Sequence, residues 1–122
     1  MLLKECYDAF GGSYEVVKTR LPKDSLIEKF VIKFLSEPSY DHLCQALAQE
    51  DYENAFRDAH SLKGVSLNLG FEKLGKSSGD LTEYLRGWAE KGIDQAQCTV
   101  LLEAVSEDYH AVISSIRKYM EA

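Results

Sequence analysis

Residues 51–70 read DYENAFRDAHSLKGVSLNLG and have the periodicity of an amphipathic α-helix. At about 100° per residue, one arc of this helix collects small and apolar side chains, with Val65 at its edge: Ala55, Ala59, Leu62, Ser66 and Leu69. The arc predicts a core face, and its small residues would let a neighbouring helix approach closely. Asp51 is the expected N-cap, and Gly70 is expected to end the helix after Leu69.

The other side of this helix is not uniformly polar. Phe56, Lys63, Gly64 and Leu67 lie at offsets of −4, +3, +4 and +7 from His60, so all five share one surface stripe. Glycine inside a helix costs roughly 1 kcal/mol relative to alanine, but here it removes a side chain that would crowd the imidazole. A lysine can direct its charge towards phosphoryl oxygens, and neutral imidazole is a nucleophile near pH 7. The stripe therefore indicates a phosphoryl-accepting histidine.

Other features have ordinary interpretations. A single histidine on a helix is usually a surface residue without a task, and we interpret His42 and His110 in this way. Gly75 and Gly79, in the following helix, are interpreted as sites of close helix packing. Only His60 combines a lysine at +3, a glycine at +4 and an apolar rim.

Helical periodicity extends over the rest of the chain, and no alternating strand pattern competes with it. Ser13, Ser39 and Asp94 are expected N-caps, and residues 36–39 are expected to form a turn. The other expected helices cover residues 1–12, 13–20, 26–35 (opening at Asp24 or Ser25), 40–50, 71–90 and 94–120. The prediction is all-α: one domain over residues 1–122, with an up-and-down antiparallel four-helix bundle over about residues 24–120 and additional short N-terminal helical segments over 1–20.

Composition limits the class of protein. With 122 residues, 45% hydrophobic and 28% charged, the chain fits one globular domain, and no apolar run is long enough to cross a bilayer. The N-terminus has no signal-peptide pattern, so we expect a cytoplasmic protein without membrane insertion. A net charge of −6 argues against nucleic acid as a partner. Cys6, Cys44 and Cys98 are expected to be reduced thiols that fill packing space.

The segment around His60 closely resembles the histidine-containing phosphotransfer (HPt) family. HSLKG (60–64) matches the His-x-Leu-Lys-Gly signature, and NLG (68–70) matches the close of its helix. Residues 9–15 and 51–60 resemble the segments that precede this signature in bacterial members, and residues 71–86 resemble the helix that packs beside it.

The resemblance implies a relay protein in which His60 exchanges a phosphoryl group with the aspartate of a receiver domain. Lys63 would steady the phosphoryl oxygens, Gly64 would keep access open, and Phe56 and Leu67 would belong to the docking surface. The implied partners are response-regulator receiver domains and an upstream hybrid sensor kinase, and the expected state is a monomer. Family members often orient the imidazole with a Gln or Glu near the position of Thr82, which is shorter; Glu83 is expected to point elsewhere.

The sequence has neither a P-loop nor an Asp-rich cluster for Mg²⁺, so we expect no cofactor, no metal and no autonomous ATP-dependent kinase activity. The prediction is a phosphocarrier rather than an enzyme. One alternative is a binding module that keeps the bundle but does not transfer phosphate. A metal-binding bundle is a weaker alternative, because Glu107 and His110 form the only pair with Glu-x-x-His spacing.

Overall fold

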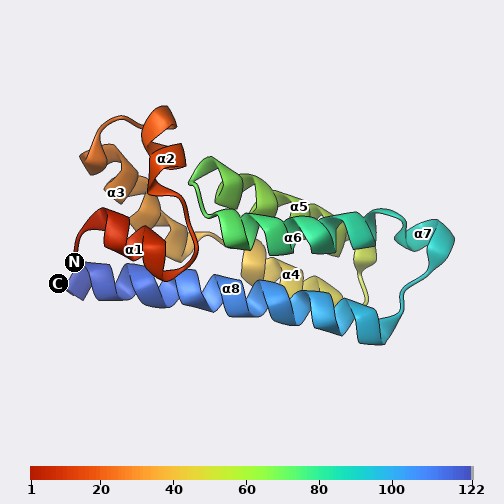
Figure 1. Ribbon diagram of the computed structural model, residues 1–122. Helices are drawn as coiled ribbons and strands as arrows, with labels where there is room; N and C mark the ends of the chain where they lie inside the picture. Colours follow the sequence, from red (N-terminus) through yellow and green to blue (C-terminus); the bar gives the residue numbers. More distant parts are fainter. Residues whose placement is uncertain (122) are drawn as a thin grey trace.

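The computed structural model describes residues 1–121, which form helices joined by short loops (Figure 1). The all-α prediction is confirmed, and no described helix is long and apolar enough to cross a membrane. In chain order the elements are α1 (Leu3–Ala9), α2 (Tyr14–Arg20), α3 (Asp24–Lys33), the 3₁₀ turn η1 (Phe34–Ser36), α4 (Ser39–Ala48), α5 (Tyr52–Asn68), α6 (Glu72–Arg86), α7 (Trp88–Lys91) and α8 (Gln95–Glu121).

Four helices, α4, α5, α6 and α8, pack antiparallel as a bundle, which confirms the predicted architecture (Figure 1). Helix α5 lies between α4 and α6, and α6 packs on α8. Large aromatic rings join α4 to α8, where Tyr40 stacks on Tyr109 with centroids 4.0 Å apart. Helix α3, expected within the bundle region, instead lies with α1 and α2 at one end of the bundle, near both chain termini (Figure 1).

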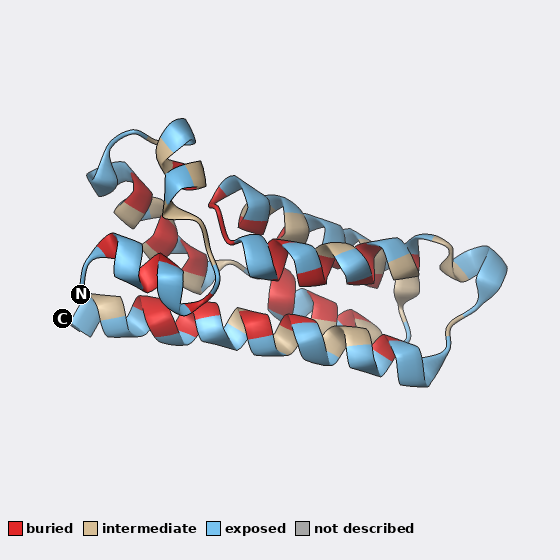
Figure 2. Ribbon diagram, in the orientation of Figure 1, coloured by how far each residue is buried: buried red, intermediate tan, exposed pale blue. Residues whose placement is uncertain are grey.

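One hydrophobic core connects these N-terminal helices to the bundle (Figure 2). The buried ring of Phe71, at the start of α6, has its centroid 5.0 to 5.6 Å from the rings of Tyr7, Phe10 and Phe34. These aromatic contacts cross from the N-terminal segment into the bundle. They support the proposal that the chain folds as a single domain, because neither part encloses its own separate core.

Several expected helix boundaries are confirmed by hydrogen bonds. Ser13 Oγ accepts from the Val16 amide at 3.2 Å, and Asp51 Oδ1 accepts from the Asn54 amide at 3.2 Å. Asp94 caps α8 in the same way, because its Oδ1 accepts from the Ala96 amide at 3.0 Å. Each cap satisfies a backbone donor that the first helical turn leaves unpaired.

Several expected boundaries were wrong. The helix expected over 1–12 covers only Leu3–Ala9, and the one expected over 26–35 ends at Lys33, where η1 begins. Ser39 is the first residue of α4 rather than its cap, and its hydroxyl donates to Glu37 Oε1 at 2.6 Å. The helix expected over 71–90 ends at Arg86, and α7 forms a separate short turn after Gly87. A glycine favours such an interruption because it lowers helix propensity by about 1 kcal/mol.

The N-terminal segment satisfies the carbonyl groups at the C-terminal end of α5. Tyr7 Oη donates to the Leu69 carbonyl at 2.6 Å, and Arg20 Nη1 donates to the Leu67 carbonyl at 2.6 Å. The Ser13 amide donates to the carbonyl of Gly70 at 2.7 Å. Gly70 has φ +75°, and a Cβ there would lie 2.6 Å from the Ser13 carbonyl oxygen, so this position requires glycine. Residues 1–20 therefore fix the end of the helix that carries His60.

Cys6 and Cys98 are buried and Cys44 is half-buried, all as free thiols. Burial raises the pKa of the Cys6 and Cys98 thiols, which keeps them protonated and unreactive at neutral pH.

Candidate functional site

The predicted core arc of α5 is confirmed. The side chains of Ala55, Ala59, Leu62 and Ser66 are fully buried, and Leu69 is also buried. The hydroxyl of Ser66 has no hydrogen-bond partner within residues 1–121. Small side chains on this arc let α4 and α6 approach α5 on either side, and the opposite arc is left facing solvent.

The stripe around His60 forms a continuous surface. His60, Gly64 and Leu67 are exposed, while Phe56 and Lys63 are half-buried. The rings of Phe56 and His60 lie nearly parallel, with centroids 6.2 Å apart and an interplanar angle of 15°. Leu67 is 40% exposed, which is unusual for a large apolar side chain in this chain. The structure therefore brings the five predicted residues together on one face.

Open space surrounds the helix one turn after His60. A Cβ built at Gly64 meets no atom within 4 Å apart from its own helix backbone and chain neighbours. Glycine is not needed there for packing, and its φ lies in the ordinary helical range. Its helix-weakening effect is therefore not offset by any contact that requires glycine.

Two glycines of α6 lie against side chains of the stripe on α5. A Cβ at Gly75 would collide with the Leu67 side chain, whose Cγ would lie 2.9 Å away. A Cβ at Gly79 would lie 3.5 Å from Lys63 Cδ, in ordinary contact. The interpretation as a close-packing position is confirmed for Gly75 but not for Gly79, where a Cβ would fit, and the packing at Gly75 involves the candidate site itself.

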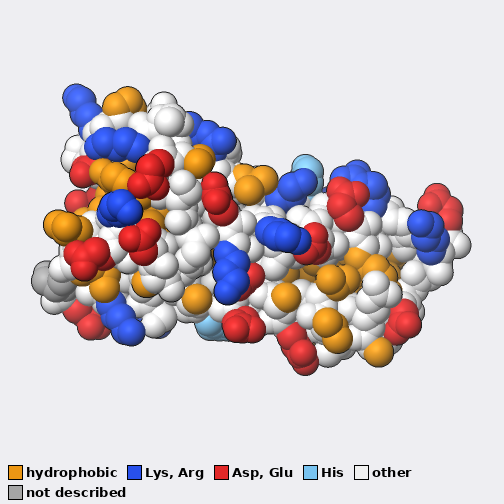
Figure 3. Space-filling view, in the orientation of Figure 1, with side chains coloured by type: hydrophobic (Ala, Val, Ile, Leu, Met, Phe, Trp, Pro, Cys, Tyr) orange, Lys and Arg blue, Asp and Glu red, His pale blue; other side chains and the backbone are white. Residues whose placement is uncertain are grey.

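Charged side chains gather on this face over α5 and α6, around a histidine (Figure 3). Arg86 donates to Glu83 through Nε and Nη2, each at 3.0 Å, and its guanidinium lies over the Phe56 ring at 5.1 Å from the centroid. Arg86 is the main cause of a lowered Glu83 pKa, and the charges of Lys63 and protonated His60 add to it. Glu83 was expected to point away from the imidazole, and its carboxylate pairs with Arg86 and makes no hydrogen bond to His60 among the described residues.

Thr82, the candidate for orienting the imidazole, is completely buried. Its hydroxyl donates to the Ser78 carbonyl of the preceding turn at 2.7 Å. The hydroxyl hydrogen of Thr82 is therefore bonded within α6 and is not donated to His60. No side chain or carbonyl in the described part of the chain forms a hydrogen bond with either ring nitrogen of His60, whose ring lies nearly parallel to that of Phe56.

Sequence reasoning missed Arg86, although the spacing of α6 contains a signal for it. Gly75, Gly79, Glu83 and Arg86 follow one another at intervals of 4, 4 and 3, so they share one face of α6. Along an antiparallel neighbour these positions meet Leu67, Lys63 and Phe56 of α5 in turn. A face built from two glycines and an ion pair is a poor core face and a suitable edge for a site.

His110 has structural surroundings, whereas His42 is exposed. His110 Nδ1 lies 2.7 Å from the Ser106 carbonyl oxygen, and the His110 ring packs edge-on against Tyr40 and Tyr109. Over residues 1–121 no group of three or more His, Cys, Asp or Glu side chains could hold a metal ion.

Comparison with curated proteins and with solved structures finds no match for this chain. Comparison with protein-family models matches residues 36–114 to the Hpt domain. The match covers more than half of the chain, and it includes α4, α5, α6 and most of α8, with the His60 stripe in its first half. The protein belongs to the Hpt domain family.

Proposed function

We propose that His60 carries a phosphoryl group between receiver-domain aspartates. Membership of the Hpt domain family implies a phosphotransfer role in a phosphorelay, and the residue that performs it is the finer step. The observation that supports His60 is its exposed ring beside the open space at Gly64, with Lys63 one turn away on the same stripe. Nδ1 of His110, by contrast, lies 2.7 Å from the Ser106 carbonyl oxygen.

In the proposed step, a neutral ring nitrogen of His60 attacks the phosphorus of a receiver aspartyl phosphate. The new N–P bond forms as the O–P bond to the aspartate breaks, and the aspartate leaves as a carboxylate. Donor, phosphorus and acceptor must lie in line, which requires the space that Gly64 leaves open. Transfer to a second receiver runs this step in reverse, with its aspartate carboxylate as the nucleophile.

Positive charge on two sides of His60 would stabilise the transferring group. Lys63 lies one turn away on α5, and Arg86 approaches from α6 above Phe56. Both can place donors near phosphoryl oxygens, where negative charge accumulates during transfer. Glu83 holds Arg86 in the resting protein, so a phosphoryl group on His60 would compete with Glu83 for that guanidinium.

The chain would act as a phosphocarrier with chemistry supplied by its partners. A receiver domain would provide the metal ion and the electrophilic groups, and an upstream hybrid sensor kinase would provide the phosphoryl group from ATP. We propose a cytoplasmic monomer that docks these partners through Phe56 and Leu67, the apolar rim of the stripe.

A second candidate is a module that binds receivers without transferring phosphate. The observation that favours it is the engagement of Thr82 within α6, which leaves His60 without an orienting partner. Docking would then depend on Phe56 and Leu67 and not on the imidazole. Both candidates share one surface, so binding and transfer must be measured separately.

The test uses the full chain and a ³²P-phosphorylated receiver domain from the same organism. His60→Gln should abolish labelling while helix content by circular dichroism is unchanged, and the matched control His42→Gln should be labelled like the unsubstituted protein. Lys63→Ala should slow labelling by on the order of tenfold, less than the hundredfold or more expected for a donor in a closed site, because Lys63 is only half-buried. Persistent label on the His60→Gln protein would show that another residue accepts the phosphoryl group.

The two candidates give different results for two further variants. For a phosphocarrier, His60→Ala removes transfer but keeps receiver affinity, whereas Leu67→Ala weakens affinity and slows transfer through it. A pure binding module would show receiver affinity without any label on the unsubstituted protein.

A further inference from the structure

One ion pair lies beside the stripe that carries His60. Arg86, the last residue of α6, donates to Glu83 through Nε and Nη2, each at 3.0 Å, so the guanidinium and the carboxylate are joined at two points. A phosphoryl group accepts from a guanidinium with the same forked geometry. One edge of Arg86 that fits a phosphoryl group is therefore already occupied by a carboxylate of the same chain.

The position of Arg86 does not depend on Glu83 alone. The guanidinium lies over the ring of Phe56, 5.1 Å from its centroid, and this ring lies nearly parallel to the imidazole of His60 at 6.2 Å. A cation above an aromatic face is attracted by the electrostatics of the ring. Arg86 can therefore stay above Phe56, one helical turn before His60, while its hydrogen bonds change partner.

Glu83 brings negative charge to a site that binds an anion in the proposed function. Hydrogen bonds from Arg86 are the main cause of its lowered pKa, and the charges of Lys63 and protonated His60 add to them. The carboxylate thus lies within electrostatic reach of the site. Lys63 and Arg86 supply two positive charges, and Glu83 cancels one of them. A phosphoryl group, with a charge of about −1.5 to −2, is attracted less strongly by these three residues than by the two cations alone.

The pair between Arg86 and Glu83 is open to exchange. Their side chains are 54% and 60% exposed, and exposed ion pairs contribute little because water and salt screen them. A phosphoryl group has more negative charge than a carboxylate and offers three acceptor oxygens. It can therefore displace Glu83 from the guanidinium, but the energy of the lost pair is subtracted from what Arg86 contributes to holding it.

We infer that Glu83 regulates how firmly the domain holds its phosphoryl group, by competing with phosphorylated His60 for Arg86. The pair is closed while His60 is unmodified, and it opens when the phosphoryl group takes the guanidinium. Because opening breaks the pair, the phosphoryl group is held less firmly and passes more readily to the next receiver. The inference rests on the proposed function, since it takes His60 as the acceptor and Arg86 as a group that stabilises the phosphoryl oxygens.

The first test measures the equilibrium constant for transfer from a ³²P-phosphorylated receiver domain to His60 of the full chain. Glu83→Gln keeps the size of the side chain and removes its charge. It should raise this constant about threefold at low salt, as expected for loss of one exposed ion pair, and the increase should shrink as salt is added. The matched control is Asp80→Asn, which removes a carboxylate that pairs with Lys76 at 3.1 Å on the same helix and should leave the constant unchanged.

A double substitution separates competition from simple repulsion. If Glu83 acts by occupying Arg86, Glu83→Gln should have almost no effect in a protein that already carries Arg86→Gln, because the two effects are coupled. An equal increase with and without Arg86 would show that the carboxylate merely repels the phosphoryl group, and would overturn the inference. So would a pair that changes only the urea midpoint and leaves the transfer constant unmoved, since its role would then be structural.

NMR spectroscopy observes the change of partner directly and needs no receiver domain. The chain has only four arginines, so the Nε–H signal of Arg86 can be assigned by its loss in the Arg86→Gln protein. Phosphoramidate, a small-molecule phosphoryl donor to histidine, should shift this signal in the unsubstituted protein and leave it in place in the His60→Gln protein. A signal that stays in place while His60 is phosphorylated would contradict the competition.

The outcomes separate this inference from the phosphotransfer function. If a receiver labels His60 but the transfer constant of Glu83→Gln equals that of Asp80→Asn, the competition is wrong and the function stands. If no receiver labels His60, the proposed function fails, and the NMR signal of Arg86 still decides whether the guanidinium changes partner.

Discussion

The two faces of α5 use the same seventeen-residue helix for different purposes. On the inner face, Ala55, Ala59 and Leu62 have no exposed surface and join α5 to its neighbours. On the outer face, His60 and Gly64 have open space around them. Hydrophobic burial fixes the position of the helix through the inner residues, so the outer residues are free to be chosen for chemistry.

This contrast predicts that substitutions can change folding stability and phosphoryl transfer separately. A change on the inner face should lower the free energy of unfolding and leave the chemistry of the folded molecules intact. A change on the outer face should alter transfer with little loss of stability. Gly64 is the clearest case, because a helix without a task would gain stability from almost any other residue there.

The largest expected effect is that of Leu62→Ala on stability. Leu62 is fully buried, so removing its side chain leaves a cavity and should lower the free energy of unfolding by about 2–5 kcal/mol. The matched control is Leu67→Ala on the outer face, which should cost less than about 1 kcal/mol because Leu67 is 40% exposed. Urea unfolding followed by circular dichroism measures the free energy of unfolding of both variants. Equal losses would contradict the difference between the two faces of α5.

Gly64→Ala should move stability and transfer in opposite directions. A Cβ at this position meets nothing within 4 Å, so alanine should raise the free energy of unfolding by up to about 1 kcal/mol. The added methyl group should occupy part of the open space through which the phosphoryl group approaches His60 and slow transfer by on the order of tenfold, since small misplacements of reacting groups are costly. Transfer at the original rate in the stabilised protein would show that Gly64 does not serve access.

Gly75→Ala, on α6, should have a smaller and mixed effect. The new methyl group would collide with the Leu67 side chain and push it outward, and the gain in helix propensity should offset part of the strain. We expect a change in unfolding free energy below about 1 kcal/mol and a change of a few fold in receiver affinity. Calorimetric titration with a receiver domain measures the second quantity, and an unchanged affinity would remove Leu67 from the docking surface.

The smallest expected effect concerns the pH dependence of stability. Burial raises the pKa of Asp58, at the edge of the α5 surface towards α4, above its ordinary value of 3.8. The folded protein therefore holds this proton more tightly, so the contribution of Asp58 to stability is present below pH 3.8 and is lost as pH rises through the folded pKa. Asp58→Asn should remove the loss of stability that accompanies ionisation of Asp58. Urea midpoints of the variant and of the unsubstituted protein, measured from pH 3 to pH 7, test this, and identical pH profiles would contradict it.

Much of the fold was predictable because the signals are local. Ser13, Asp51 and Asp94 cap their helices within three residues, and Gly70 ends α5 through its own backbone conformation. The outer stripe was predictable for the same reason, since helical geometry alone places its five residues on one face.

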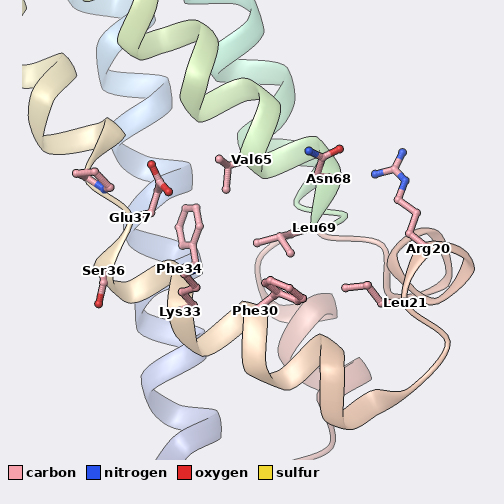
Figure 4. A pocket seen from close by; sticks show the side chains of 11 residues that line it. Arg20, Leu21, Phe30, Lys33, Phe34, Ser36, Glu37, Val65, Asn68 and Leu69 are labelled. Atoms are coloured by element: carbon pink, nitrogen blue, oxygen red, sulfur yellow. The ribbon is translucent and has the colours of Figure 1, made fainter.

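The parts that could not be predicted depend on contacts between distant segments. Arg86 reaches the stripe only because α6 packs antiparallel to α5, and Arg20 reaches the Leu67 carbonyl across 47 residues of sequence. The position of α3 at the end of the bundle likewise depends on how it packs and not on its own periodicity. A groove beside the C-terminal end of α5 (Figure 4) needs α3, η1 and α5 together and has no signature in any single segment.

The most direct test of the central claim is to locate the phosphoryl group by mass spectrometry. Trypsin separates the three histidines, with His42 in peptide 34–57, His60 in peptide 58–63 and His110 in peptide 92–117. After incubation with a phosphorylated receiver domain, the account predicts phosphate on peptide 58–63 that is lost in acid and kept in alkali, as for a phosphohistidine rather than phosphate on Ser61. Phosphate on either of the other two peptides, or acid-stable phosphate on peptide 58–63, would contradict it.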